Sequence, residues 1–269
     1  MGYIEELASA ERKVHSIIQV PVEFSSAILY RYSSACVVPS GEVVFLPFSA
    51  RYCGIYNPES QKFQESTADL TVATYKWQSG VYSNISKEVI GVPSGSNDVL
   101  CFKWDSDDSI DAVSLEPTGL TGNGKFTGCC EIYDGRIVMA PNSALNVGIF
   151  TPNPLGGGTF TSGPVIPEVD DGKYSGCSLG RNGKVIMAPF DASRIGIYDP
   201  ELNTFSVGAY NFGLGGDKFV GTVPLPNGKI LFVPSVYPNV GLYDPETDTY
   251  EDGPAIPATW SPNHAYGGG

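Results

Sequence analysis

One stretch of the chain, KYSGCSLGRNGKVIMAPFDASRIGIYDP (residues 173–200), recurs on both sides of itself. The copy after it reads KFVGTVPLPNGKILFVPSVYPNVGLYDP (218–245), and the copy before it reads KFTGCCEIYDGRIVMAPNSALNVGIFTP (125–152). Two more diverged copies begin at Arg31 and Lys76. A proline recurs in all five copies at intervals of 46, 48, 48 and 45 residues, namely Pro47, Pro93, Pro141, Pro189 and Pro234. A period of this length without a helical pattern is typical of a β-propeller with one blade per repeat.

Each repeat carries the signals of four strands. In the last copy, residues 220–225 alternate, Asn227-Gly228 predicts a two-residue hairpin turn, and residues 229–234 form an apolar run. Residues 239–243 and 249–253 then predict two further strands on either side of an Asp-Pro turn. The sequence therefore predicts an all-β propeller of four-stranded antiparallel blades.

The repeats organise the whole chain as one predicted domain, residues 1–269. The blades are expected at residues 31–75, 76–124, 125–172, 173–217 and 218–263, with closing segments 1–30 and 264–269. Residues 16–22 resemble the last strand of a blade and residues 263–267 resemble the first strand of one. We therefore expect six blades with a composite N-/C-terminal closing blade, which would remove two exposed sheet edges. Five blades plus tails is the alternative.

Composition limits the partners. With 269 residues, 32 glycines, 21 prolines and 42% hydrophobic residues, the chain can bury a large core in a turn-rich domain. A formal charge of -13 argues against nucleic acid or an anionic membrane as the main partner. No apolar run is long enough to span a bilayer, and the acidic start MGYIEELASAERK lacks the features of a signal peptide. Neither membrane insertion nor conventional secretion is expected.

Small residues and aromatics recur on the first strand of each repeat. Gly128, Gly176 and Gly221 are predicted to lie near the propeller axis, where a larger side chain would clash. The aromatic residue shortly before this position is predicted to pack between blades, and it is one of Tyr32, Trp77, Phe126, Tyr174 and Phe219.

The six cysteines are predicted to be reduced and to serve as small apolar residues. Cys129 and Cys130 are adjacent in sequence, so their side chains should point to opposite faces of a strand. No histidine or second CxxC pair accompanies them, and a zinc site is therefore not expected.

The usual catalytic motifs are missing from the sequence. His15 and His264 are its two histidines, and it has no HExxH, no GxSxG, no P-loop and no sialidase-type Asp box. Acids such as Asp199 and Asp244 are predicted to cap turns, although carboxylates from different blades could still meet. We therefore expect neither enzyme activity nor a cofactor.

One acidic cluster has the ligand spacing of a calcium loop. Its members are Asp105, Asp107, Ser109, Asp111 and Glu116. Ile110 stands where the sharp turn of such a loop needs glycine, and no helices flank the segment. Two interpretations stay open, a cation site and a solvated loop at the tip of a blade.

A base opens the first strand of every repeat, and the five are Arg31, Lys76, Lys125, Lys173 and Lys218. We call these five residues the cationic column. The period predicts a positive ring at one mouth of the central channel, where it could bind an anionic ligand. In the alternative interpretation each base pairs with a local acid, such as Asp171 or Asp217.

The segments IYDPELNTF (197–205) and LYDPETDTY (242–250) resemble the third-to-fourth strand region of kelch-type propellers. The paired glycines of kelch repeats are missing from the second strand, and the outer-strand tryptophan is replaced by Phe63, Phe160, Phe205 or Tyr250. The repeats are also similar to unclassified propeller repeats of bacteriophage structural proteins and microbial surface proteins. This resemblance implies a role in binding or assembly.

These features together predict a non-enzymatic propeller that acts as an interaction module, as a structural or receptor-binding component of a virion or extracellular assembly. The expected partners are proteins in that assembly or an anionic glycan, with homo-oligomers as a further expectation. The alternative is a glycan-binding, lectin-like propeller or a carbohydrate-active propeller enzyme.

Overall fold

The computed structural model describes residues 30–71, 75–105, 110–167, 171–213 and 215–257. In this part of the chain every regular element is a β-strand, and the strands form five separate four-stranded antiparallel sheets. The predicted all-β propeller of four-stranded blades is confirmed.

The strands of each blade follow one another in sequence and in space. Blade 1 contains β1 (Tyr32–Val37), β2 (Val43–Pro47), β3 (Gly54–Asn57) and β4 (Lys62–Glu65). Blade 2 contains β5 (Trp77–Tyr82), β6 (Val89–Pro93), β7 (Asp98–Asp105) and β8 (Ile110–Pro117). Blade 3 contains β9 (Phe126–Glu131), β10 (Ile137–Pro141), β11 (Asn146–Pro152) and β12 (Gly158–Val165). Blade 4 contains β13 (Tyr174–Leu179), β14 (Val185–Pro189), β15 (Arg194–Asp199) and β16 (Thr204–Asn211). Blade 5 contains β17 (Phe219–Pro224), β18 (Ile230–Pro234), β19 (Asn239–Asp244) and β20 (Thr249–Ala255).

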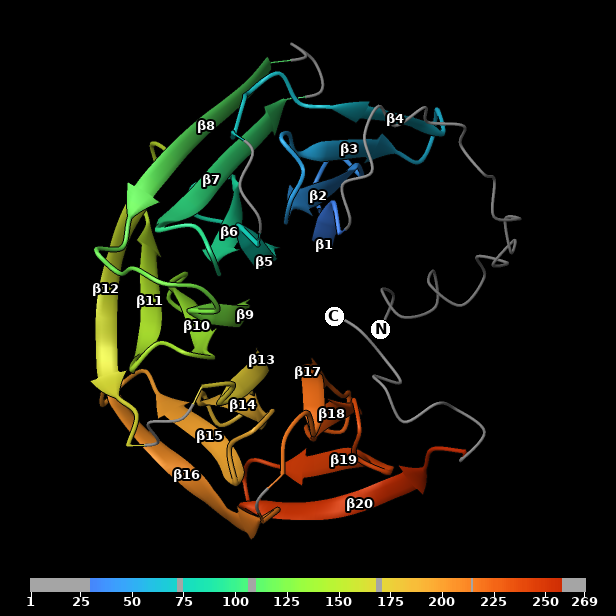
Figure 1. The fold of residues 1–269 in the computed structure, drawn as a ribbon, viewed down its shortest axis with the longest axis vertical. Helices are drawn as coiled ribbons and strands as arrows, with labels where there is room; N and C mark the ends of the chain where they lie inside the picture. The colour runs from blue at the N-terminus through green and yellow to red at the C-terminus, as the bar shows by residue number, and fades with distance from the viewer. Residues whose placement is uncertain (1–29, 72–74, 106–109, 168–170, 214, 258–269) are drawn as a thin grey trace, which may run out of the picture.

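The five blades follow an arc around a common centre (Figure 1). The first strands lie innermost, and those of consecutive blades contact one another from blade 1 to blade 5; they are β1, β5, β9, β13 and β17. The arrangement is consistent with five blades plus tails. The predicted composite blade would use residues 16–22 and 263–267, which lie outside the described residues.

The recurring prolines close the second strand of every blade, at the ends of β2, β6, β10, β14 and β18. The next residue links two blades through its backbone. Phe48 N–H donates to Arg31 O of its own blade (2.9 Å), and Phe48 O accepts from Lys76 N–H of the following blade (2.8 Å). The same pair of bonds recurs at Ser94, Asn142 and Phe190. Each repeat therefore joins its neighbour at the position that directly follows the period-setting proline.

The hairpin between the first two strands differs from the predicted two-residue turn. Leu225 N–H donates to Lys229 O (2.8 Å) and Gly228 N–H donates to Leu225 O (2.9 Å), so three residues form the loop. Gly228 has φ +92°, a left-handed conformation that favours glycine, as this type of loop requires.

The inner-strand aromatics pack both within their own blade and, as predicted, against the preceding blade. Phe126 and Tyr174 are fully buried, and Tyr174 lies 5.9 Å from Phe205 of the outer strand, measured between ring centroids. The Tyr174 ring packs against Gly196 of β15, where an added Cβ would lie 2.9 Å from the ring. This contact explains the glycine of the IGIYDP motif, because a side chain at that position would displace the aromatic ring.

The core lies between blades as well as within them. One buried cluster joins Val138 and Val147 of blade 3 to Tyr174, Val185 and Met187 of blade 4. Because each sheet has apolar residues on both faces, a blade inside the arc is covered on both sides.

Gly128, Gly176 and Gly221, which we call the glycine column, mark the closest approach of the inner strands. A Cβ at Gly128 would lie 2.4 Å from Gly176 Cα, and a Cβ at Gly176 would lie 2.7 Å from Gly221 Cα. Both distances exclude any side chain without movement of the backbone. At Gly221, the last member, an added Cβ meets its nearest atom, on Val233, at 3.7 Å.

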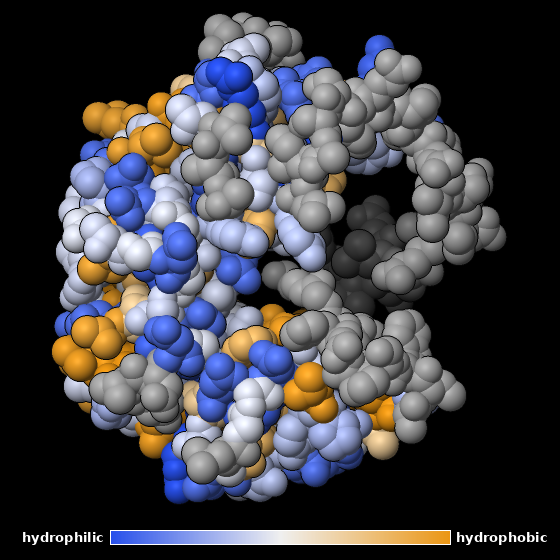
Figure 2. All heavy atoms as spheres, in the orientation of Figure 1, coloured by the Kyte–Doolittle hydropathy of each residue, from blue (hydrophilic) through white to orange (hydrophobic). Residues whose placement is uncertain are grey.

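Hydrophilic residues spread over the described part of the face shown in Figure 2, with hydrophobic residues in separate groups among them. Within the described ranges, no helix is long and apolar enough to cross a membrane.

Candidate functional site

The structure places the lysines of the cationic column inside the protein. Lys76, Lys125, Lys173 and Lys218 are between 1% and 5% exposed, whereas Arg31 is partly exposed. The sequence predicted an open positive ring, and the structure instead shows four lysines packed under the loops that enter and leave their blades.

Backbone carbonyl groups accept hydrogen bonds from three of these ammonium groups. Lys125 Nζ donates to Gly122 O (2.5 Å), and Lys76 Nζ donates to Thr71 O (2.8 Å) and to Ala50 O. Lys218 Nζ donates to Asp191 O (3.2 Å) and to Gly215 O. Ala50 and Asp191 belong to the preceding blade, so these lysines fasten consecutive blades together. Whether the column binds an anion stays a prediction.

Burial changes the acid strength of two column members. It lowers the pKa of Lys76 to about 8, although nearby Cys53 and Asp69 act in the opposite direction. Burial also lowers the pKa of Lys125, opposed by the charge of Asp98. In both cases the low-polarity surroundings disfavour the ammonium form. These lysines therefore carry more neutral amine at a given pH than a surface lysine does.

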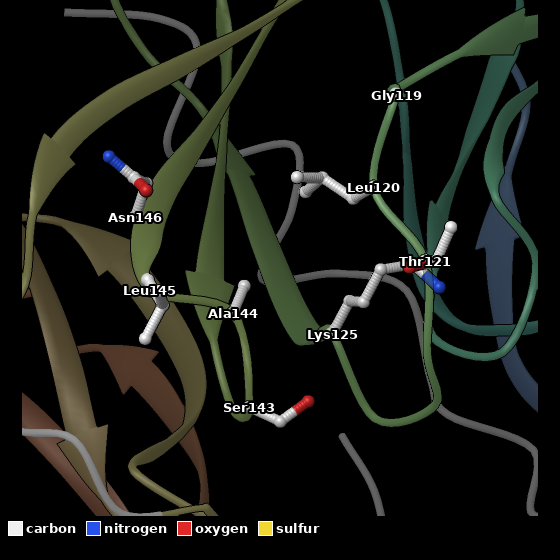
Figure 3. A pocket seen from close by; sticks show the side chains of 8 residues that line it. All are labelled: Gly119, Leu120, Thr121, Lys125, Ser143, Ala144, Leu145 and Asn146. Carbon is white, nitrogen blue, oxygen red and sulfur yellow. The ribbon is translucent and has the colours of Figure 1, made fainter.

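Lys125 lines a cavity of about 330 Å³ on the side of the ring where β9 begins. Residues 119–121, from the connection between blades 2 and 3, and residues 143–146, after β10, form its other walls. Figure 3 shows the Lys125 side chain extending from the start of β9 toward residues 119–121. Ser143 Oγ donates to Asn123 O (2.8 Å), which holds the two walls at a defined separation.

The repeat pattern did not predict this cavity, because one of its walls is the connection between two repeats. The segment TGLTGNG (118–124) was the available signal, since its glycines precede a buried lysine. Gly122 and Gly124 have φ of +96° and +68°, conformations that suit glycine in a tight loop. We call this cavity, formed by residues 119–121, Lys125 and residues 143–146, the Lys125 cavity.

The acidic cluster is not a single loop in the structure. Asp107 and Ser109 lie outside the described residues, and strand β8 already begins at Ile110. Asp111 and Glu116 are five positions apart on that strand, which is about 16 Å, and alternation turns them to opposite faces. Asp111 and Glu116 therefore cannot bind the same ion, and the calcium-loop interpretation does not hold for these two residues. Among the described residues there is no group of three or more potential metal ligands.

Asp111 and Glu116 contact different neighbouring blades. The carboxylate of Asp111 accepts bonds from the backbone N–H groups of Thr67 (2.5 Å) and Ala68 (3.0 Å) of blade 1. Burial alone would raise the pKa of Asp111, but these bonds and that of the Thr67 hydroxyl lower it. Glu116 accepts a bond from Ser114 Oγ (2.9 Å) and lies beside Gly157 of blade 3.

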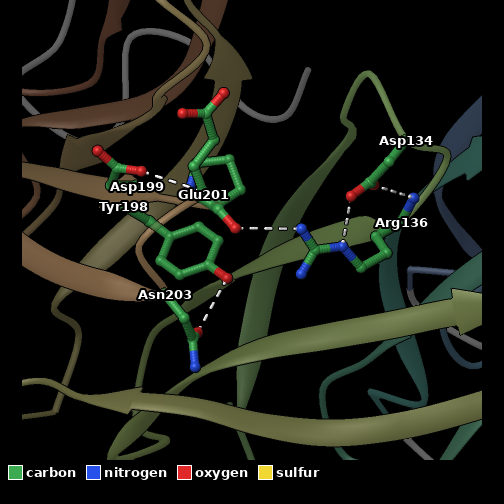
Figure 4. A network of polar contacts seen from close by, with 7 residues as sticks. Asp134, Arg136, Tyr198, Asp199, Glu201 and Asn203 are labelled. Carbon is green, nitrogen blue, oxygen red and sulfur yellow. Dashed lines mark hydrogen bonds and ion pairs between the residues drawn. The ribbon is translucent and has the colours of Figure 1, made fainter.

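The Asp-Pro turns lie at the end of the blades opposite the Lys125 cavity, and they act as predicted. Asp199 Oδ1 accepts the backbone N–H of Glu201 (3.1 Å), and Asp244 Oδ1 accepts that of Glu246 (3.0 Å). Figure 4 shows how Arg136 of blade 3 reaches this turn, donating to Pro200 O (3.2 Å) while its Nε pairs with Asp134 (2.8 Å). These acids have structural partners, so they are poor candidates for catalytic carboxylates.

The cysteines are free thiols, as predicted. Cys36, Cys53, Cys101 and Cys177 are buried, while Cys129 and Cys130 are partly exposed. Cys129 packs with residues of blades 2 and 3, whereas Cys130 packs with the core shared by blades 3 and 4. The predicted opposite orientation of the adjacent pair is confirmed.

Comparisons with known proteins support the propeller fold but do not identify a family for this chain. No family model matches the sequence, and a search of curated proteins finds no match. The predicted kelch and phage resemblances therefore stay predictions.

Solved structures share the propeller fold at low sequence identity. A streptogramin B lyase matches with a TM-score of 0.65 and 14% identity, covering 86% of this chain and 72% of that chain. A catalytically inactive histidine-to-alanine variant of virginiamycin B lyase from Staphylococcus aureus, with quinupristin, matches with a TM-score of 0.67 and 15% identity. This match also covers 86% of this chain and 72% of that chain. A putative 6-phosphogluconolactonase from Bacteroides uniformis matches with a TM-score of 0.56 and 16% identity, covering 78% of this chain and 66% of that chain.

These neighbours overturn the prediction of a non-enzymatic interaction module, together with the expectation that the chain is not an enzyme. Lyases and a putative lactonase are among the proteins that share its propeller fold. The error has a physical origin. A motif search detects catalytic groups that are close in sequence, whereas a propeller builds its sites from loops of different blades.

Proposed function

We propose that this chain is a propeller enzyme that binds a small polar substrate in the Lys125 cavity. The observation that carries the proposal is the cavity itself, a hollow of about 330 Å³ with a buried lysine in its wall. This volume is within the range of sites for small molecules. A buried ionisable group with a shifted pKa in a concave site is a frequent mark of a functional site.

Lys125 is the candidate proton acceptor. Its lowered pKa increases the fraction of neutral amine, and a neutral amine can take a proton. In a lyase reaction of this kind the first step is removal of a proton from the substrate by a base. In a lactonase reaction the first step is activation of a water molecule by a base. The fold neighbours, which include both kinds of enzyme, support these two reaction classes.

The substrate class follows from the walls of the cavity. Ser143 and Asn146 provide polar groups, while Leu120, Ala144 and Leu145 provide apolar surface. A lactone, or one sugar unit of a glycan, combines polar and apolar edges in this way. The carbohydrate-active enzyme that the sequence offered as an alternative belongs to this class.

Turnover assays on the wild-type chain test the proposal. The panel contains simple lactones, quinupristin and uronate-containing polysaccharides, with acid release and new double bonds as the readouts. Replacing Lys125→Met should lower kcat by about 100-fold, the usual contribution of a general base. Lys218→Met is the matched control, because Lys218 occupies the same repeat position, is also buried and lies in blade 5.

Three outcomes would contradict the proposal. Absence of turnover on the whole panel would argue against an enzyme of either class. Equal loss in the Lys125 and Lys218 variants would mean that buried lysines act only through stability. Loss in His15→Ala or His264→Ala with full turnover in Lys125→Met would place the base on a histidine, outside the described residues.

A further inference from the structure

Two thiols face each other across the boundary between blades 3 and 4. Cys130 lies on β9 and Cys177 on β13, and their sulfur atoms are 3.7 Å apart. Cys177 is 6% exposed, whereas Cys130 is partly exposed. Of the two thiols, Cys130 is therefore the more accessible to solvent.

The glycine column explains why the two strands are so close. Gly128 is two residues before Cys130 and Gly176 directly precedes Cys177, and a Cβ at Gly128 would lie 2.4 Å from Gly176 Cα. A disulfide needs Cα atoms about 4.4–6.8 Å apart and sulfurs at about 2.05 Å. Because the backbones approach closely at this point, side-chain rotation can bring the sulfurs together without separating the strands.

We propose that Cys130 and Cys177 are a redox modification site, at which a small disulfide such as oxidised glutathione converts the thiol pair into a reversible bond between blades 3 and 4. The site is independent of the Lys125 cavity, so either proposal can fail alone.

The reaction proceeds by two thiol–disulfide exchanges. Cys130 loses its proton and attacks one sulfur of oxidised glutathione, which forms a mixed disulfide and releases one glutathione thiolate. Cys177 then loses its proton and attacks the Cys130 sulfur, which forms the Cys130–Cys177 bond and releases the second glutathione. The two thiols lose two protons and two electrons in total, and the oxidant takes up both electrons.

Cys129 provides an internal control. It is adjacent to Cys130 on β9, yet it packs toward blade 2 rather than blade 4. The same reagent can modify Cys129, but no bond from Cys129 to Cys177 is expected.

The experiment treats the folded wild-type chain with oxidised glutathione, blocks the remaining thiols with iodoacetamide and maps the digested peptides by mass spectrometry. The expected product is one cross-linked peptide pair, Cys130–Cys177, which dithiothreitol reverses. The cross-link closes a long loop, so the oxidised chain should melt about 5–10 °C higher than the reduced chain.

The variants decide between a specific site and general oxidation. Cys129→Ser should keep the cross-link and the rise in Tm, and Cys130→Ser should lose both. Glutathione left on Cys130 of the wild type without the cross-link would overturn the proposal, as would a pairing of Cys130 with any other cysteine. Because the wild-type peptide map is decisive by itself, the test does not depend on the folding of a variant.

Discussion

Blades 4 and 5 are close copies in sequence, yet they lie in different surroundings. In blade 4, all five residues of β14 are buried, and Ile186, Ala188 and Ile195 have no exposed surface. In blade 5, the matching residues Leu231, Val233 and Val240 are partly exposed. The reason is position, because the far face of blade 4 packs against blade 5, whereas no described sheet covers the far face of blade 5.

The comparison separates two properties of a repeat protein. The local sequence specifies the sheet, since the register between second and third strands is the same, with Val185 opposite Tyr198 and Ile230 opposite Tyr243. The neighbouring blade determines what each position contributes to stability. This is the behaviour expected when stability is a sum of repeat and interface contributions.

The largest expected difference is at the glycine column. Gly176→Val should destabilise the protein by about 4 kcal/mol, because its φ of +80° is unfavourable for valine and its Cβ would lie 2.7 Å from Gly221 Cα. Gly221→Val should cost about 1 kcal/mol or less, because the nearest atom is 3.7 Å away. From the sequence alone, the two substitutions were expected to be equally harmful. Urea unfolding of both variants measures the difference, and equal midpoints would remove the distinction between the two blades.

A smaller difference is expected on the apolar faces. Ile186→Ala should cost about 3 kcal/mol, because Ile186 is fully buried between blades 4 and 5. Leu231→Ala, at the same repeat position, should cost about 1 kcal/mol, because Leu231 keeps part of its surface in solvent. Chemical denaturation measures both values. Similar costs would show that the far face of blade 5 is as well covered as that of blade 4.

The sequence predicted the blade correctly because its signals are local. The proline at the end of each second strand, the glycine of each hairpin and the Asp-Pro turn all act within a few residues of themselves. The glycine of the IGIYDP motif was not explained, because its reason is the Tyr174 ring, which arrives from another strand.

The candidate site was less predictable, because its features depend on contacts between repeats. The period correctly placed a base at the start of each inner strand, but burial of Lys76 and Lys218 comes from carbonyls of the preceding blade. The calcium-like spacing failed because strand β8 begins at Ile110, so Asp111 and Glu116 are on an extended strand rather than in a loop. The Lys125 cavity lies between two loops that strands β9 and β10 separate in the sequence.

The smallest expected effect is on the pH dependence of stability, and it compares a lysine buried between two blades with an exposed lysine. Lys76 is 3% exposed between blades 1 and 2, and burial lowers its pKa to about 8, whereas Lys62 is exposed on β4. An unfolded lysine titrates near 10.4. Between about pH 8 and pH 10, the unfolded chain therefore binds more protons at residue 76 than the folded chain does, and this residue makes stability rise with pH.

Lys76→Met should remove that rise, so the stability difference between variant and wild type should change by about 1 kcal/mol across the window. Lys62→Met is the control and should leave the difference constant. The comparison uses differences, because tyrosines such as Tyr237, whose pKa burial raises to about 12, act in the opposite direction at higher pH. Urea unfolding at a series of pH values measures the change. Parallel curves for wild type and Lys76→Met would mean that water reaches this ammonium group at the boundary between blades 1 and 2.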